Sequence, residues 1–155
     1  MFRSALASLA LVALSLGPVQ ASIAESWYVA SDADSVHLVL GVPDTDEASL
    51  DISCQPGSGE VTVRSFIGSN GLLSGEDAEI RLEGLRTRAS FPGKALANDE
   101  SGGIDVEGHG PLAALEGIVK SARPFSLIVK GARHIISPAG MADPYMTFAE
   151  VCAKP

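Results

Sequence analysis

Hydrophobic and polar residues alternate through most of the chain up to about residue 107. In the clearest example, over residues 78–83, Ala78, Ile80 and Leu82 alternate with charged residues. A period of two places successive side chains on opposite faces of a strand, so this segment is predicted to be a half-buried strand. The same pattern predicts short strands near residues 27–29, 36–40, 50–54, 61–64, 87–91, 94–97 and 104–107. Pro92 and Gly93 either join or interrupt the strands on either side of them.

The period changes after residue 110. A helix is predicted over about 111–121, because Pro111 suits a first helical turn and apolar residues then recur at steps of three and four: Leu112, Leu115, Ile118 and Val119. A final hairpin is predicted over residues 125–129 and 134–136. Asp143 as cap and Pro144 after it predict the start of a second helix. One face of that helix carries Tyr145, Phe148, Ala149 and Cys152.

The order of these elements defines a fold class. We expect a mainly antiparallel β fold, either a sandwich or an open barrel, with about eight to nine short strands, one helix before the last hairpin and one C-terminal helix. The chain has 155 residues, no internal repeat and no low-complexity linker, so a single domain is expected. Aromatic residues make up only 5% of the chain, and the core is therefore expected to be aliphatic.

The first 21 residues have the pattern of a secretory signal peptide. Arg3 gives a positive start, residues 5–16 are apolar and uncharged, and a small-residue cleavage pattern ends at Ala21. The domain is therefore expected to span residues 22–155, and the protein to be periplasmic or secreted. Removing residues 1–21 takes away Arg3 and no acid, which leaves 10 bases, 19 acids and a formal charge of −9. This charge argues against nucleic acid as a partner, and no later segment is apolar enough to span a membrane.

Cys54 and Cys152 are the two cysteines of the chain. Cys54 falls on the apolar face of its predicted strand with Leu50 and Ile52, and Cys152 falls on the apolar face of the last helix. Both are thus predicted to be buried, and an oxidising compartment allows them to form a disulfide.

The sequence contains neither a G-x-S-x-G nor an S-x-x-K motif for nucleophilic catalysis. One alternative function is a small hydrolase with a Ser-His-Asp site assembled from distant positions, for example around His109 with Asp105. The other is a periplasmic copper-binding protein, since imidazole and thioether ligands suit copper. Its candidate ligands are His109, His134, Met141 and Met146. Neither alternative is favoured, and no cofactor is expected.

The expected function is that of an exported, non-catalytic envelope protein that binds another protein or a small ligand. The candidate contact surface consists of Trp27, on an early edge strand, and Leu72 with Leu73, in a loop.

The layout of the chain from residue 22 onward also resembles a known family. A lone Trp27, Cys54 on an early strand, Pro138-x-Gly140 and a last helix with Phe148 and Cys152 resemble the small proteobacterial periplasmic proteins of the invasion-associated locus B type. That resemblance implies a non-catalytic envelope protein, and it assigns no functional residue.

Overall fold

The computed structural model describes residues 24–153, and the predicted signal peptide lies outside the described residues. Residues 24–153 form nine strands and two helices. They are β1 (Ser26–Ser31), β2 (Val36–Gly41), β3 (Ala48–Cys54), β4 (Glu60–Ser65), β5 (Asp77–Glu83), β6 (Arg88–Asn98), β7 (Gly103–Pro111), α1 (Ala113–Ser121), β8 (Phe125–Val129), β9 (Ala132–Ile136) and α2 (Ala142–Cys152).

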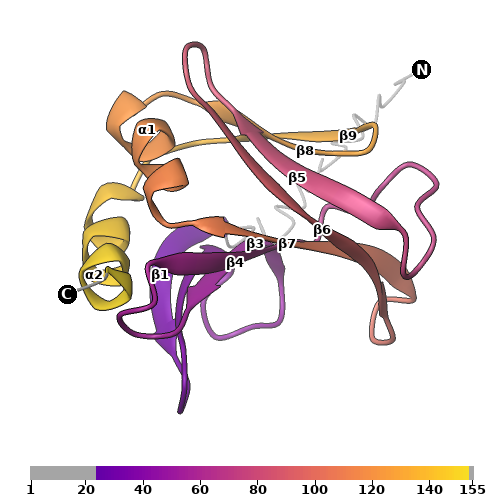
Figure 1. Cartoon of the computed structure of the whole chain (residues 1–155), viewed down its shortest axis with the longest axis horizontal. Coiled ribbons are helices and arrows are strands. Elements are labelled where there is room, and N and C mark those ends of the chain that lie inside the picture. Colours follow the sequence, from indigo (N-terminus) through magenta and orange to yellow (C-terminus); the bar gives the residue numbers. More distant parts are fainter. Residues whose placement is uncertain (1–23, 154–155) are drawn as a thin grey trace, which may run out of the picture.

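All nine strands belong to one antiparallel sheet in the order β1-β2-β3-β4-β7-β6-β5-β8-β9. Figure 1 shows this sheet curling around, with β1 to β4 on one side and the β8–β9 hairpin on the other. The predicted class is confirmed, and of its two forms the open barrel is the one observed. The strands β1 and β9 are the edges of the sheet, and each pairs with a neighbour on one side only.

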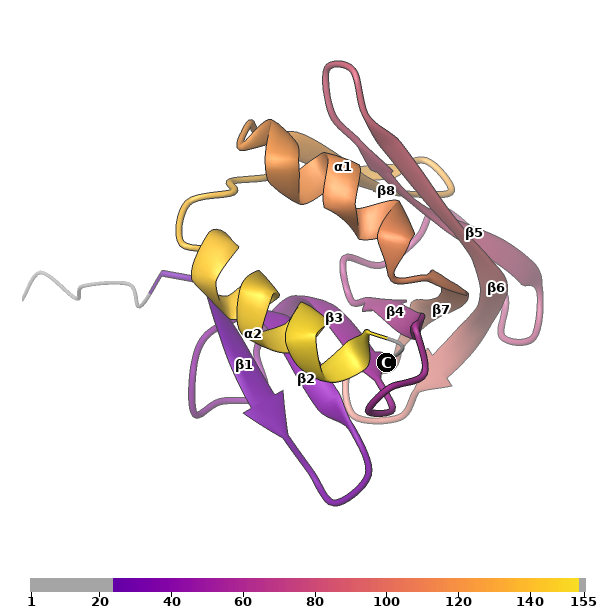
Figure 2. The same cartoon turned by 60° about the vertical axis from the view of Figure 1, so that its left-hand side comes forward.

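Both helices lie on the concave side of the sheet, next to each other (Figure 2). Helix α1 packs on β6 and β7, and α2 packs on β1 and β2. The alternating apolar residues of the strands meet the helices there in one core, which includes Leu50 and Ile52 of β3, Ile118 of α1 and Phe148 of α2. Burial of this apolar surface, which includes Phe91, Phe125 and Phe148 beside the aliphatic residues, is the main favourable contribution to folding.

Residues 87–91 and 94–97 form a single strand, β6, which resolves the ambiguity at Pro92 and Gly93. The ladder between β6 and β7 starts only at the pair Gly93 and Gly108, so on that side Pro92 needs no N–H group. A Cβ atom on Gly93 would overlap the backbone of Glu107, and one on Gly108 would overlap the backbone of Phe91. Glycine at these two positions therefore allows the two strands to approach closely.

Both helices begin at other residues than predicted. Pro111 is the last residue of β7, where it pairs with Glu60, and α1 begins at Ala113. Helix α2 begins at Ala142, so Asp143 lies in its first turn and is not its cap. An acid in the first turn still interacts favourably with the helix dipole. The propensities of Pro and Asp for helix starts located these helices to within about two residues, which is the usual uncertainty of helix ends.

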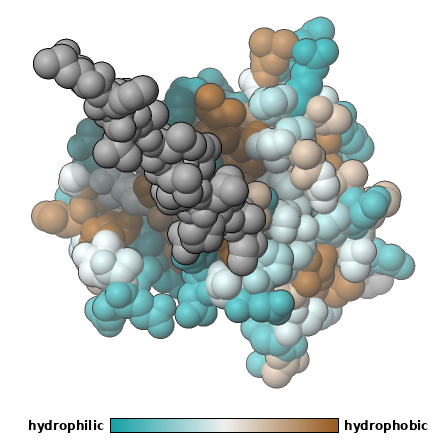
Figure 3. Space-filling model, turned by 180° about the vertical axis from the view of Figure 1, so that it is seen from behind, coloured by the Kyte–Doolittle hydropathy of each residue, from teal (hydrophilic) through white to brown (hydrophobic). Residues whose placement is uncertain are grey.

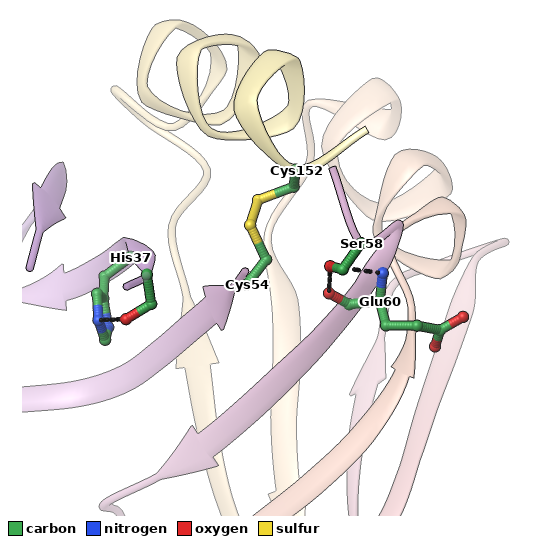
Figure 4. The surroundings of a disulfide bond; sticks show 6 residues. His37, Cys54, Ser58, Glu60 and Cys152 are labelled. Atoms are coloured by element: carbon green, nitrogen blue, oxygen red, sulfur yellow. Dashed lines mark hydrogen bonds between the residues drawn. A yellow bond between two sulfur atoms is a disulfide. The ribbon is translucent and has the colours of Figure 1, made fainter. Parts of the chain in front are cut away.

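The predicted disulfide is present. Cys54, at the end of β3, is bonded to Cys152, at the end of α2, with a Cα–Cα distance of 5.8 Å. Figure 4 shows this bond joining the strand to the helix above it. The carbonyl groups of Val151 and Cys152 also accept hydrogen bonds from Gly57 and Gly59 of the β3–β4 turn. The end of α2 is thus attached to the sheet by a covalent bond and by two backbone hydrogen bonds.

The two edges of the sheet meet at one point. The indole Nε1 of Trp27, in β1, donates a hydrogen bond of 3.0 Å to the carbonyl of Ser137, just after β9. A hollow of about 250 Å³ lies beside this contact and is lined by residues of both edges, Trp27 and His134 among them. Among the described residues, no further backbone hydrogen bond joins β1 or β9 to another segment across its outer edge.

Candidate functional site

Four side chains form a hydrogen-bonded group on the convex face at the β1–β2 turn, which we name the His37 cluster: Asp32, Ser35, His37 and Asp51. His37 Nδ1 lies 3.0 Å from both carboxylate oxygens of Asp51, on the neighbouring strand β3. His37 Nε2 lies 2.9 Å from the hydroxyl of Ser35 and 3.2 Å from Asp32. The imidazole is thus enclosed by two carboxylates and one hydroxyl (Figure 4 shows His37 on its strand).

The cluster favours a protonated imidazole. Burial alone lowers the pKa of His37, but the charges and hydrogen bonds of Asp51 and Asp32 outweigh it and raise this pKa above its usual value. Backbone N–H groups of Asp34 and Ser35 and the Ser35 hydroxyl lower the pKa of Asp32. Burial raises the pKa of Asp51 despite the nearby charges of His37 and Arg64. An imidazolium donating to both carboxylates satisfies every polar atom of the group.

The distances within the cluster resemble those of a Ser-His-Asp triad, but its chemistry differs. The Ser35 hydroxyl lies 2.9 Å from both oxygens of Asp32, and this carboxylate is a stronger acceptor than imidazole. A protonated His37 cannot accept the serine proton. The N–H groups of Asp34 and Ser35 both donate to Asp32 and are therefore not free to stabilise an oxyanion. The geometry is that of a stabilised turn.

The hydrolase site considered from the sequence does not form around His109. Asp105 is bonded to Arg64 at 2.9 Å and to Asn98 at 3.0 Å, whereas His109 lies 3.1 Å from the Thr62 hydroxyl. Sequence reasoning also missed the His37 cluster. Ser35 and His37 are two residues apart, which places them on one face, but the contact with Asp51 depends on the register of β2 and β3.

A shallow hollow of about 390 Å³ lies beside the cluster. Hydroxyl groups of β3, β4 and the adjoining turns dominate its lining, together with His109 of β7: Ser35, Ser53, Ser58 and Thr62. Several of these groups are already satisfied locally, since Thr62 bonds His109 and Ser58 bonds the backbone of Glu60 (Figure 4). The hollow thus offers few free hydrogen-bonding groups to a ligand.

The four candidate copper ligands do not share a site. His109 lies on β7 and His134 on β9, and three strands, β6, β5 and β8, separate them in the sheet. Met141 is buried in the core, whereas Met146 is 62% exposed on another face of α2. Within residues 24–153, no group of three or more His, Cys, Asp or Glu side chains has a geometry that suits a metal ion.

The predicted contact surface needs correction at two of its three residues. Trp27 and Leu72 are each only 6% exposed, and both belong to the hydrophobic core. Leu73 is 68% exposed, as expected. The other exposed large hydrophobic residues lie on separate elements: Leu85, Ile135, Met146 and Val151. Seen from behind, the visible surface is mostly hydrophilic or intermediate, with hydrophobic residues in several separate places (Figure 3).

Comparisons with known proteins found no match to this chain among family models, curated proteins or solved structures. In the part of the chain that the structure describes, neither helix is long and apolar enough to cross a membrane.

Proposed function

We propose that this chain is an exported, non-catalytic binding domain that captures an extended segment of another envelope protein along the free edge of β1. The observation that carries this proposal is the outer edge of β1: within residues 24–153 this strand pairs only with β2, on its other side. An edge strand presents a row of unpaired N–H and C=O groups, and an extended peptide can add to it as a further strand.

The strand β1 has the features of an edge that accepts a partner. Its sequence is Ser-Trp-Tyr-Val-Ala-Ser, with no charged residue and no proline. All six residues pair with β2 in one continuous register, without a bulge. Proteins usually protect such edges from association with charges, prolines or bulges. The lack of all three in β1 supports a role in recognition.

The convex face of the sheet supports this choice because its charges are already matched. One row across five strands alternates in sign: Asp51, Arg64, Glu107, Lys94 and Asp77. At one end of this row, Lys94 and Asp77 form an ion pair of 2.7 Å. Arg64 forms a further ion pair with Asp105. Cross-strand pairs of opposite charge stabilise a sheet by themselves. The charges of this row are therefore compensated within the sheet.

Export is supported by two independent features. A disulfide persists in an oxidising compartment and is rare in the cytosol, and Cys54 and Cys152 form one. Residues 1–21 have the sequence pattern of a signal peptide. The absence of catalysis is supported by the His37 cluster, in which the serine hydroxyl is held by a carboxylate.

A peptide of sequence KKTVTVTVKK provides the test. Residues 22–155 are mixed with this peptide, and amide hydrogen exchange is followed by NMR. The proposal expects slower exchange in β1 and unchanged exchange in β9. A peptide with N-methyl groups on all six central residues cannot form backbone hydrogen bonds and is expected not to bind. Equal binding of the methylated peptide, or protection confined to other strands, would refute the proposal.

A further inference from the structure

Acidic residues stand at both ends of the uncharged strand β1. Glu25 precedes it, and Asp32 and Asp34 follow it in the β1–β2 turn. Between Ser22 and Val63 the chain carries eight acids and no lysine or arginine. Burial first, and then the negative charges of Asp51 and Asp44, raise the pKa of the Tyr28 phenol in the middle of β1. Acidic side chains therefore flank this edge at both ends.

Most of the acids at these two ends have no cationic partner. Among the described residues, neither Glu25 nor Asp34 forms an ion pair, nor do Asp46 and Glu47 of the β2–β3 turn. Glu25, Asp46 and Glu47 line one side of a hollow of about 550 Å³, with Glu100 from the β6–β7 turn also in its lining. A positively charged side chain would complement the unpaired acids at this end of β1.

The same charges disfavour a second copy of this chain as the partner. In an antiparallel pair centred on Tyr28 and Val29, Glu25 of one copy would lie opposite Asp32 of the other. In a parallel pair in register, every acid of one chain would lie next to the same acid of the other chain. Like charges directly opposite each other destabilise a strand pair. The edge thus resists pairing with itself although its centre is uncharged.

We infer that the segment captured by β1 is an extended stretch of about six uncharged residues with lysine or arginine at both ends. This inference rests on the proposed function and specifies the partner's chemistry. Because both ends of β1 are acidic, the basic residues match the edge whether the segment runs parallel or antiparallel to it.

Three peptides with one centre and different ends test the inference: KKTVTVTVKK, SSTVTVTVSS and EETVTVTVEE. Fluorescence anisotropy with residues 22–155 is expected to rank them in this order at 0.1 M salt, with at least tenfold between the first and the last. The differences in affinity among the three peptides should decrease at 1 M salt, because the Debye length falls from about 10 Å to about 3 Å.

Variants that lack particular acids show which of them cause the preference for the lysine peptide. Glu25→Gln with Asp34→Asn is expected to reduce the preference for the lysine peptide at least threefold. The matched control, Glu79→Gln with Glu116→Gln, changes the net charge equally but on β5 and α1, and should leave the preference unchanged. If all three peptides bind equally, the inference fails and the proposed function stands. If none binds, or if binding does not protect β1, the proposed function itself fails.

Discussion

The two edge strands of this sheet differ in the way they meet solvent. The strand β9 has five residues, and its Arg133 lies 2.9 Å from the Ser126 hydroxyl and 3.9 Å from Glu83, so its side chains contact the neighbouring strands. The strand β1 has six residues and no charge. Short length and an edge arginine are common ways to prevent strand addition. The two edge strands therefore differ in charge: β9 carries an arginine that contacts its neighbours, and β1 carries no charged residue.

The largest effect should follow removal of the disulfide. Replacing Cys54 and Cys152 by Ala opens a link between residues 98 positions apart. Loop entropy predicts a loss of about 4 to 5 kcal/mol in unfolding free energy, an upper value for real proteins. Because α2 packs on β1 and β2, hydrogen exchange should accelerate there more than in β8 and β9. Urea unfolding and exchange measured together test this, and uniform acceleration would contradict it.

Trp27 links the two edges, so its truncation should affect both. Trp27→Ala removes a buried side chain and the hydrogen bond to Ser137, and should cost about 3 to 5 kcal/mol. Trp27→Phe keeps most of the apolar contact but removes the hydrogen bond to Ser137. Its unfolding free energy should fall by about 1 kcal/mol more than the lost apolar area explains. Chemical denaturation measures both variants. A cost of Trp27→Ala below about 1 kcal/mol would show that the edges do not depend on this contact.

The sequence predicted the features that depend on local periodicity. Alternation located the strands, and steps of three and four placed Phe148 and Cys152 on the buried face of α2. Prediction from the sequence failed where contacts between distant segments determine which residues are buried or bonded. Trp27 lies on an edge strand, but α2, which follows more than a hundred residues later, packs on that strand, and Trp27 belongs to the core. The contact of His37 with Asp51 depends on the β2–β3 register, which shifts between Leu40 and Gly41, and no local pattern gives such a shift.

A charge placed on the open edge should make it resemble the protected one. Ala30 is exposed near the end of β1, and Ala30→Lys should weaken binding of KKTVTVTVKK about tenfold, or about 1.4 kcal/mol. Ile135, which is 71% exposed on β9, gives the matched control. Ile135→Lys adds the same charge to the other edge and should leave binding unchanged. Both variants should keep their stability within about 0.5 kcal/mol, as usual for surface changes. Similar losses in both would show that net charge, and not the β1 edge, controls binding.

The smallest expected effect is the pH dependence of the β1–β2 turn, which the His37 cluster attaches to β3. The pKa of His37 is raised in the folded state, so its protonated form stabilises the fold fully below about pH 6.5 and is lost as pH rises through the raised value. Between pH 6 and 9, the stability advantage of the wild type over His37→Gln should therefore decrease, by less than about 1 kcal/mol for a group that solvent still partly screens. Asp32 and Asp51 face the imidazole, and Arg64 lies opposite Asp51 on the next strand. His134→Gln, on β9, is the control for replacing a histidine outside the cluster. Urea unfolding at each pH measures the three proteins, and an advantage that grows with pH would mean that His37 is neutral in the folded chain and holds the turn as a hydrogen-bond acceptor.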